Sequence, residues 1–296
     1  MIYLIVNAHA KGMTTPDART AFVELAAREL PHASVSFAER GEDVPRLTLD
    51  AIAAGATIIV AGGGDGTVNA VAGLLMDTEV TLGVLPFGTL NHFARDVGMP
   101  EATEDALRVF SGGRVVDVDV GEVNGRIFLN NTGLGLYPEM VHQREQRQQK
   151  GAGKWTSAIR EGLRALMRYR LLGVRIVLNG ETLLRRTPAV MVGNNEYVLQ
   201  GLVAPTRARL DAGMLSLYVP HPRARLTLVW FAFRALFWRS FPDDRFDLSL
   251  TDSLTIESRR HQLRVSLDGE VTTMAPPLTY RSRRKALRVM VPEPTV

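Results

Sequence analysis

The residues TIIVAGGGDGTVNAV, at positions 57–71, join a β-branched run to a glycine-rich turn and then to a helical pattern. Four of the turn residues are glycines: Gly62, Gly63, Gly64 and Gly66. Glycine lets a ligand approach the backbone closely, and the N–H groups and dipole of a helix N-terminus favour an anion. The stretch therefore predicts a phosphate-binding loop, with a simple tight turn as the alternative. It also raises a question, because a carboxylate, Asp65, lies within the loop.

A second loop of the same kind follows the next predicted strand. The residues LPFGTLNHFARD (85–96) run from a strand end to a helical pattern, and the turn carries Gly88, Thr89 and Asn91. At the end of the first predicted strand, the sequence NAHAKG begins with Asn7. Open α/β sheets bind ligands outside the carboxyl ends of their strands. These three polar strand ends therefore predict one nucleotide site.

The chain changes character at about residue 113. Before it, strand and helix patterns alternate, which predicts an α/β layer with parallel strands. After it, short alternating strands surround Asn-Gly turn signals at 124–125 and 179–180. Helical patterns at 154–172 and 223–240 interrupt these strands. The second half is thus expected to be mostly antiparallel β structure.

These patterns set the expected domain boundaries. A nucleotide-binding α/β domain is predicted for residues 1–120 and a mostly antiparallel β domain for residues 121–280. The residues KALRVMVP (285–292) form a last predicted strand that could return to either domain. A return of the segment 281–296 to the first domain is one of these two possibilities.

Composition excludes several classes of protein. The 296 residues are 46% hydrophobic and contain no cysteine, so disulfides, thiolate metal sites and a cysteine nucleophile are excluded. The longest apolar run, residues 226–238, is shorter than the about 20 residues that span a bilayer. The N-terminus lacks the basic region and the cleavage site of a signal peptide. We therefore expect a cytoplasmic protein that does not span the membrane.

The two glycine loops do not match two common phosphate cradles. The Walker pattern G-x-x-x-x-G-K-[ST] occurs nowhere in the chain. A dinucleotide fingerprint that starts at Gly62 would need glycine at the position of Thr67. Another kind of nucleotide loop is therefore required.

Together the loops carry a family resemblance. GGGDGT at 62–67, followed about 20 residues later by PFGTLNHFA, closely resembles the diacylglycerol-kinase catalytic-domain family, which includes sphingosine and ceramide kinases and bacterial lipid kinases. GGDGT alone is shared with NAD kinases and 6-phosphofructokinases, whereas the second loop favours the lipid branch. The resemblance covers essentially the whole chain. It implies a three-layer, NAD-kinase/phosphofructokinase-like α/β domain, a C-terminal β-sandwich, and ATP and Mg²⁺ as cofactors.

A kinase gives Asp65 a role that a simple anion site does not. Phosphoryl transfer needs positioned phosphates, a metal ion and a group that orients or deprotonates the acceptor. We expect Asp65 to bind Mg²⁺ or to organise the acceptor, because a carboxylate is attracted to the metal and repelled by bare phosphates. The residues expected to bind the nucleotide come from all three strand ends: Asn7, Gly62, Gly63, Gly64, Gly66, Thr67, Gly88, Thr89 and Asn91.

A second carboxylate lies in the stretch VSLDGEV, residues 265–271. By itself, Asp268-Gly269 is a hairpin-turn signal. A similar L-D-G-E in the resembled family contains the catalytic base, so the resemblance implies that Asp268 accepts the proton of a lipid hydroxyl. Glu270 is a secondary catalytic candidate, as a hydrogen-bonding or metal-binding support.

The sequence departs from the family pattern at several positions. Ala8 follows Asn7 where proline is usual, and His92 follows Asn91 where aspartate is usual. An aspartate often found near the position of Tyr137 is missing. In LDAGML (210–215), Ala212 stands where some bacterial members bind a structural metal. We therefore assign no structural metal, although Asp211 is next to that position.

The lipid side of the prediction rests on a basic stretch. Between His142 and Arg175 there are nine Lys and Arg against two Glu, and Arg160, Arg164 and Arg168 follow at helical spacing. Such a helix could rest on an anionic membrane or pack on the sandwich with a solvated basic face, and both interpretations stay open. We expect a lipid substrate at the membrane surface and peripheral membrane association. Little aromatic interleaving argues against nucleic acid, and a homodimer stays open.

Two other functions remain as alternatives. One is a kinase of a soluble hydroxyl substrate, of the NAD-kinase type, because GGDGT is common to both groups. The other is a non-catalytic nucleotide or lipid sensor, which the departure at Ala212 favours. Phosphorylation of NAD would identify the first, and ATP binding without turnover would identify the second.

Overall fold

The computed structural model describes residues 1–136, 138, 171–198, 206–220 and 246–294. Most of the predicted helix at 154–172, all of that at 223–240, and Tyr137 lie outside these ranges. The first helix was predicted too long at its C-terminal end, because Leu172 begins strand β8 (Leu172–Leu178). The alternating residues of this strand are buried, a period of two that a helix cannot have.

The chain divides into two compact units. Unit 1 contains Met1–Val120 and Arg283–Val296, and unit 2 contains Gly121–Ser282. The boundaries expected from the sequence are 1–120 with 281–296 for the first domain and 121–280 for the second. Unit 1 is therefore discontinuous along the chain.

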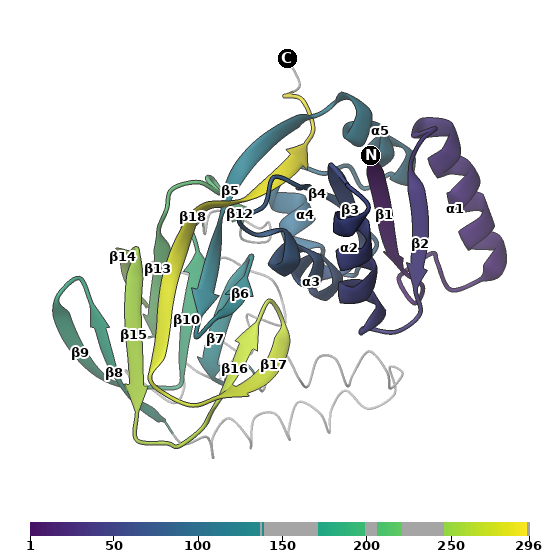
Figure 1. The fold of residues 1–296 in the computed structure, drawn as a ribbon. Coiled ribbons are helices and arrows are strands. Elements are labelled where there is room, and N and C mark those ends of the chain that lie inside the picture. Colours follow the sequence, from purple (N-terminus) through teal and green to yellow (C-terminus); the bar gives the residue numbers. More distant parts are fainter. Residues whose placement is uncertain (137, 139–170, 199–205, 221–245, 295–296) are drawn as a thin grey trace, which may run out of the picture. The chain divides into compact units, whose positions relative to one another are not determined.

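Unit 1 is a parallel sheet with helices on both faces (Figure 1). Its strands lie in the order β2 (Ser34–Ala38), β1 (Ile2–Asn7), β3 (Ile58–Gly63), β4 (Thr81–Pro86) and the end of β18 (Leu278–Val291). Its helices are α1 (Pro16–Glu29), α2 (Asp43–Ala53), α3 (Asp65–Leu75), α4 (His92–Asp96) and α5 (Thr103–Gly112). Helices α2 and α3 pack together, as do α1 and α5, which gives the expected three layers.

The strands of unit 1 are buried because helices cover both faces of the sheet. Ile59, Val60 and Ala61 of β3 are each fully buried, as are Leu82 and Leu85 of β4. Continuous burial of this kind is typical of central parallel strands. It explains why the sequence shows apolar runs here instead of alternation.

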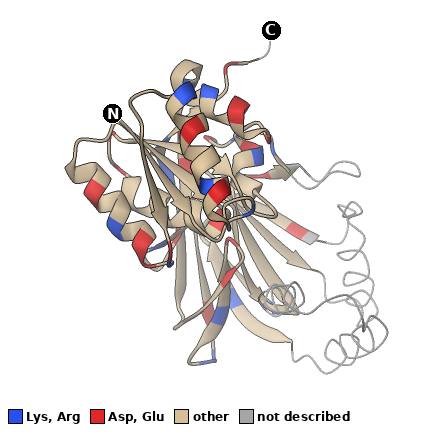
Figure 2. Ribbon diagram, turned by 90° about the vertical axis from the view of Figure 1, so that its right-hand side faces the viewer, with Lys and Arg blue, Asp and Glu red and all other residues tan. Residues whose placement is uncertain are grey.

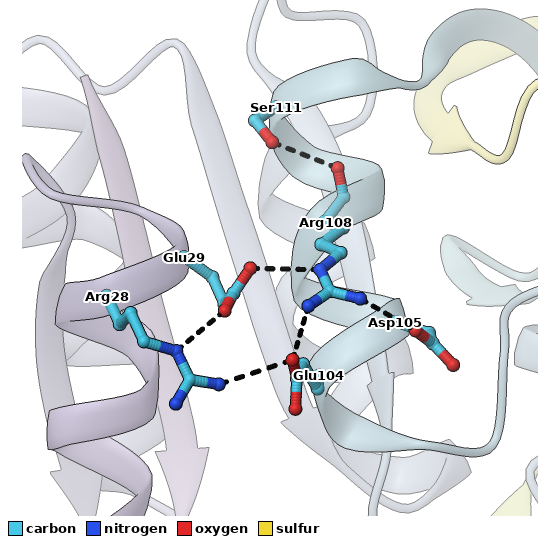
Figure 3. A network of polar contacts seen from close by, with 6 residues as sticks. All are labelled: Arg28, Glu29, Glu104, Asp105, Arg108 and Ser111. Carbon is cyan, nitrogen blue, oxygen red and sulfur yellow. Dashed lines mark hydrogen bonds and ion pairs between the residues drawn. The ribbon is translucent and has the colours of Figure 1, made fainter.

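A charged network connects helices α1 and α5 on the surface of unit 1 (Figure 3). Arg28 Nε and Arg108 Nε donate to the two carboxylate oxygens of Glu29, at 2.9 and 3.0 Å. The hydrogen bond from Arg28 and then that from Arg108 lower the pKa of Glu29. Arg108 also pairs with Glu104 and Asp105 of its own helix. Figure 2 shows acidic and basic residues mixed along the helices of this unit.

Unit 2 contains two antiparallel sheets. The first has the order β14 (Phe246–Thr251), β13 (Leu215–Pro220), β10 (Ala189–Asn194), β7 (Asn131–Gly135), β16 (Leu263–Leu267) and β17 (Glu270–Met274). The second contains the start of β18, β15 (Ser253–Ser258), β8 and β9 (Glu181–Thr187). Strand β5 (Arg114–Val123) pairs with β18, and its end, from Gly121 on, lies in unit 2 and pairs with β6 (Arg126–Phe128). A short ribbon joins β11 (Tyr197–Val198) and β12 (Thr206–Arg207).

Both sheets contribute to one apolar core, which makes unit 2 a β-sandwich. Leu134, Val192 and Val265 come from the first sheet, and Ile176 and Tyr280 come from the second. These side chains occupy alternate strand positions and have at most 1% of their surface exposed. The predicted antiparallel character of this half is therefore confirmed.

The predicted hairpin turns are also present. Asn124-Gly125 and Asn179-Gly180 both have positive φ at both residues, between 47° and 80°. Asparagine and glycine tolerate this conformation, which two-residue hairpins require. The last strand, predicted for 285–292, is longer than expected and begins at Leu278.

Candidate active site

The first glycine loop leads from β3 into α3. Strand β3 ends at Gly63, and Gly64 is the N-cap residue of α3, with an extended backbone and no side-chain cap. Val68 makes the first intrahelical hydrogen bond, to the oxygen of Gly64 at 3.1 Å. The N–H groups of Asp65, Gly66 and Thr67 therefore precede the intrahelical ladder and are oriented to receive an anion.

The two glycine loops are in backbone contact. A Cβ atom placed on Gly88 would lie 2.5 Å from the Cα of Gly64 and 2.7 Å from Asn91 Oδ1. A Cβ on Gly63 would lie 2.5 Å from Thr67 Oγ1. Gly63 and Gly88 are thus required because other backbone or side-chain atoms occupy the space of a Cβ. Neither position shows a positive φ that would explain the glycine otherwise.

Asn91 locks the second loop. Its Oδ1 accepts the N–H of Gly88 at 2.9 Å, and its Nδ2 donates to the carbonyls of Pro86 and Gly88, both at 3.0 Å. Its own backbone is left-handed, with φ of 49°. The predicted phosphate ligand Asn91 therefore uses its side chain to shape the loop. Thr89 lies exposed at the tip of the same loop.

Asp65 connects the two loops. It is the first residue of α3, and its Oδ1 accepts the N–H of Phe93 in α4 at 3.3 Å. A carboxylate at a helix N-terminus is also favoured by the helix dipole. Among the described residues, no group of three or more acidic or histidine side chains could hold a metal ion. Asp65 is therefore not part of such a group within the described residues.

The first strand end lies beside the other two. Strand β3 pairs in parallel with both β1 and β4, so that Val6 is opposite Gly62 and Gly62 is opposite Leu85. Asn7 follows directly, and its Oδ1 accepts the N–H of His9 at 2.9 Å in an Asx-turn. Lys11 N–H donates to the carbonyl of Phe87 at 3.0 Å. The structure thus brings the three predicted strand ends together.

The sequence did not predict a role for Arg19. From helix α1, this residue holds the loop that follows β1. Its Nε donates to Met13 O at 2.8 Å and its Nη2 to Ala8 O at 3.2 Å, while Nη1 pairs with Glu39 at 2.6 Å. The guanidinium carbon also lies 5.5 Å from the centre of the Phe37 ring. No local pattern announces this role, because the partners of Arg19 lie in other elements.

In unit 2, Asp268 lies in the turn between β16 and β17. Asp268 and Gly269 have φ of 46° and 95°, so the predicted hairpin turn is present. Asp268 Oδ2 accepts the N–H of Leu129 at 2.7 Å, and Oδ1 accepts those of Asn130 and Asn131 at 2.8 and 3.0 Å. Three such bonds hold the carboxylate in one orientation. Glu270 begins β17 and is exposed.

A buried polar cluster contacts Leu129 and Asn130, and the sequence did not predict it. Arg207, only 6% exposed, donates to the carbonyls of Leu129 and Asn194 and to Asn130 Oδ1, at 2.5, 3.0 and 3.0 Å. Asn194 Nδ2 donates to the same Leu129 carbonyl at 3.0 Å. The arginine and asparagines of this cluster are far apart in the sequence, and the fold brings them together. Two Asn-Asn pairs, at 130–131 and 194–195, are the available sequence signal.

Ala212, which stands where some family members bind a structural metal, lies on the surface of unit 2. Ala212 is exposed, and the neighbouring Asp211 is an exposed carboxylate that pairs with Arg209 at 3.1 Å.

In the part of the chain that the structure describes, none of the helices has the length and apolar character needed to cross a membrane.

Two family models match the chain. Residues 1–123 match the diacylglycerol kinase catalytic domain, and residues 140–291 match the YegS C-terminal NAD kinase beta sandwich-like domain. A diacylglycerol kinase structure from Bacillus anthracis str. Sterne has a TM-score of 0.71 and 21% identity, covering 98% of this chain and 96% of that chain. At this identity the likeness concerns the fold.

Curated relatives extend the comparison. Proteins named "Probable lipid kinase YegS-like" from Enterobacter sp. and "Probable lipid kinase YegS" from Shigella boydii are 30% and 31% identical over 188 residues. The aligned stretch spans 61% of this chain and 62% of each relative, which is less than two thirds of their length. From the two domain matches, the chain belongs to the diacylglycerol kinase catalytic-domain family, with a C-terminal domain of the YegS type.

Proposed function

We propose that the protein is an ATP-dependent lipid kinase, which transfers the γ-phosphate to a hydroxyl of a lipid such as diacylglycerol. The main supporting observation is the bare backbone contact between Gly64 and Gly88, beside the open N-terminus of α3. Such a surface suits phosphate oxygens, because it presents N–H groups without side chains in the way. Family membership supports the same activity.

Asp65 is the proposed metal-binding carboxylate of this site. Mg²⁺ is usually held by one or two carboxylates together with substrate phosphates, so a single acidic residue fits it. When bound, the ion would neutralise charge on the transferred phosphoryl group. Asp65 would hold it at the start of α3, with Oδ1 kept in place by Phe93 N–H.

Asp268 is the proposed general base. Its carboxylate would accept the proton of the lipid hydroxyl, whose oxygen forms a bond to the γ-phosphorus while the bond to the β-phosphate oxygen breaks. The three N–H bonds on Asp268 set the direction of its carboxylate. Asp268 would thus orient the hydroxyl as well as accept its proton. Glu270 is a secondary candidate, as a hydrogen-bonding or metal-binding support from an exposed position at the start of β17.

The test is transfer of labelled γ-phosphate from ATP to a panel of hydroxyl lipids in mixed micelles, with NAD as an extra acceptor. Asp65→Asn and Asp268→Asn are compared with exposed controls in the same units, Asp50→Asn and Asp252→Asn. We expect label in one lipid, a loss of roughly 100-fold or more in the first two variants, and little change in the controls. Full activity in Asp268→Asn would remove the base from the proposal.

A non-catalytic nucleotide sensor is the second candidate. It is favoured by one observation: both candidate carboxylates are engaged by backbone N–H groups. Binding of ATP with no label in any lipid or in NAD would support the sensor. Label in NAD alone would instead identify a kinase of a soluble substrate.

A lipid substrate also requires access to a membrane. We infer peripheral association with anionic membranes from the cytoplasmic side, supported by the basic stretch between His142 and Arg175. Flotation with vesicles of anionic and of neutral lipid tests it, and equal recovery with both would contradict an electrostatic attachment.

A further inference from the structure

We propose that Arg207 is a positioning residue, which holds the segment Leu129–Asn131 and through it the carboxylate of Asp268. This inference rests on the proposed catalytic role of Asp268. It assigns to a buried arginine of unit 2 a part in phosphoryl transfer that neither its position in the sequence nor a local motif indicates.

The first step of the argument is a shared peptide group. The peptide bond between Leu129 and Asn130 presents its carbonyl to Arg207 at 2.5 Å and its N–H to Asp268 Oδ1 at 2.8 Å. A positive and a negative side chain thus bind the two ends of one peptide dipole. In a buried setting such a chain of hydrogen bonds is mutually strengthening, because each bond polarises the next.

Arg207 also contacts the side chain of Asn130, the residue whose N–H binds Asp268. Asn130 Oδ1 accepts from Arg207 Nη2 at 3.0 Å, while the backbone N–H of the same residue serves Asp268. Arg207 therefore holds Asn130 by both its preceding carbonyl and its side chain. Movement of the guanidinium would displace two of the groups that determine where the N–H vectors point.

The geometry specifically needs arginine. Arg207 Nη1 contacts the carbonyls of Leu129 and Asn194, and Nη2 contacts Asn130, so the planar fork reaches three oxygens at once. The guanidinium carbon lies 5.8 Å from the centre of the Tyr197 ring, which gives a cation–π contact. A lysine ammonium supplies the charge without the fork and cannot reach the same three oxygens in one position.

The direct test is hydrogen exchange in peptides that cover residues 124–135, in the intact protein. Arg207→Met removes the charge, Arg207→Lys keeps it, and Arg209→Met is the matched control at an exposed arginine two residues away. We expect the amides of Leu129–Asn131 to exchange roughly 10- to 100-fold faster in Arg207→Met, with a smaller change in Arg207→Lys. The control should be unchanged. Protection of β10 in each variant verifies that the sandwich is folded.

Kinetics then separate positioning from general destabilisation. In Arg207→Lys we expect kcat to fall roughly tenfold or more at unchanged KM for ATP, because the glycine loops belong to unit 1. A fall in kcat with an equal rise in KM for ATP would point to general damage and would overturn the proposal.

The outcomes distinguish the two proposals. Unchanged amide exchange in both Arg207 variants would overturn the positioning role, whatever the activity of Asp268→Asn. Faster exchange at 129–131 together with wild-type kcat in folded Arg207→Lys would also overturn it, provided that Asp268→Asn is inactive. If Asp268→Asn is fully active, the catalytic role of Asp268 fails first, and the positioning role fails with it.

Discussion

The contact between Gly64 and Gly88 allows a quantitative test of the nucleotide site. In Gly88→Ala the new Cβ would lie 2.5 Å from Gly64 Cα, whereas carbon atoms prefer about 3.5–4.0 Å. The two loop backbones must therefore separate by about 1 Å. Gly64 Cα is a backbone atom and cannot rotate away, and Asn91 Oδ1, at 2.7 Å from the new Cβ, can move only by giving up its hydrogen bond to Gly88 N–H.

The expected cost follows from these contacts. Overpacking against rigid atoms costs about 1–3 kcal/mol, and loss of the bond between Gly88 N–H and Asn91 costs about 1 kcal/mol more. Replacing glycine by alanine restricts the unfolded chain, which restores about 0.4–1 kcal/mol. We expect a net loss of about 2 kcal/mol, or roughly 5–10 °C in the melting temperature of unit 1.

Gly64→Ala is a matched control on the other side of the same contact. Its Cβ would meet Gly88 Cα at 3.5 Å, an ordinary van der Waals distance. We expect its stability within about 1 kcal/mol of the wild type, because the entropy gain opposes the poorer N-cap. Both variants are measured by thermal and urea unfolding without nucleotide. Equal stability of the two would refute the close contact of the loops.

Three further changes test other contacts of unit 1. Asn91→Ala should destabilise the protein by about 1 kcal/mol more than Asn91→Gly in urea unfolding, because alanine is disfavoured at a φ of 49°; equal losses would contradict the left-handed loop. Arg19→Lys should weaken binding of an ATP analogue severalfold in calorimetry, because lysine cannot bind Glu39 and two carbonyls of the loop after β1 together. Unchanged affinity would show that the loop after β1 does not contribute to nucleotide binding. In Arg108→Met the loss of stability should be full above the unfolded-state pKa of Glu29 and should shrink as pH falls below it, because Arg28 and Arg108 lower this pKa in the folded state. If the stability difference between Arg108→Met and the wild type in urea unfolding did not change with pH, the contact between Arg108 and Glu29 would not be the cause of the destabilisation.

The sequence predicted the framework of the site better than the roles of its side chains. Strand and helix periodicity placed the loops at residues 62–67 and 85–96 at strand ends, and parallel pairing then brought them together. Glycine and asparagine signals also marked the turns at 124–125 and 179–180. These features depend on local conformation, which a residue pattern reports directly.

The roles of individual polar groups could not be predicted in the same way. Asn91 was expected to contact phosphate and is occupied by its own loop. Asp268 was expected from the family resemblance, but its three N–H donors lie 137–139 residues away in the chain. Arg207 had no local signal, since two of its partners lie 77 and 78 residues away. Long-range hydrogen bonds of this kind are decided by the packed fold.

Strand β18 has a consequence for biosynthesis. Strand β4 pairs on one side with β3 and on the other with the end of β18, which is made only after all of unit 2. Until then a nascent chain carries a sheet with an open, apolar edge at β4, a template for unwanted strand pairing. Unit 2 is one continuous segment, Gly121–Ser282, so its sheets need no strand that is made after the unit itself. We therefore expect the sandwich to mature first on the ribosome, with the nucleotide unit most exposed to chaperones and to aggregation during translation.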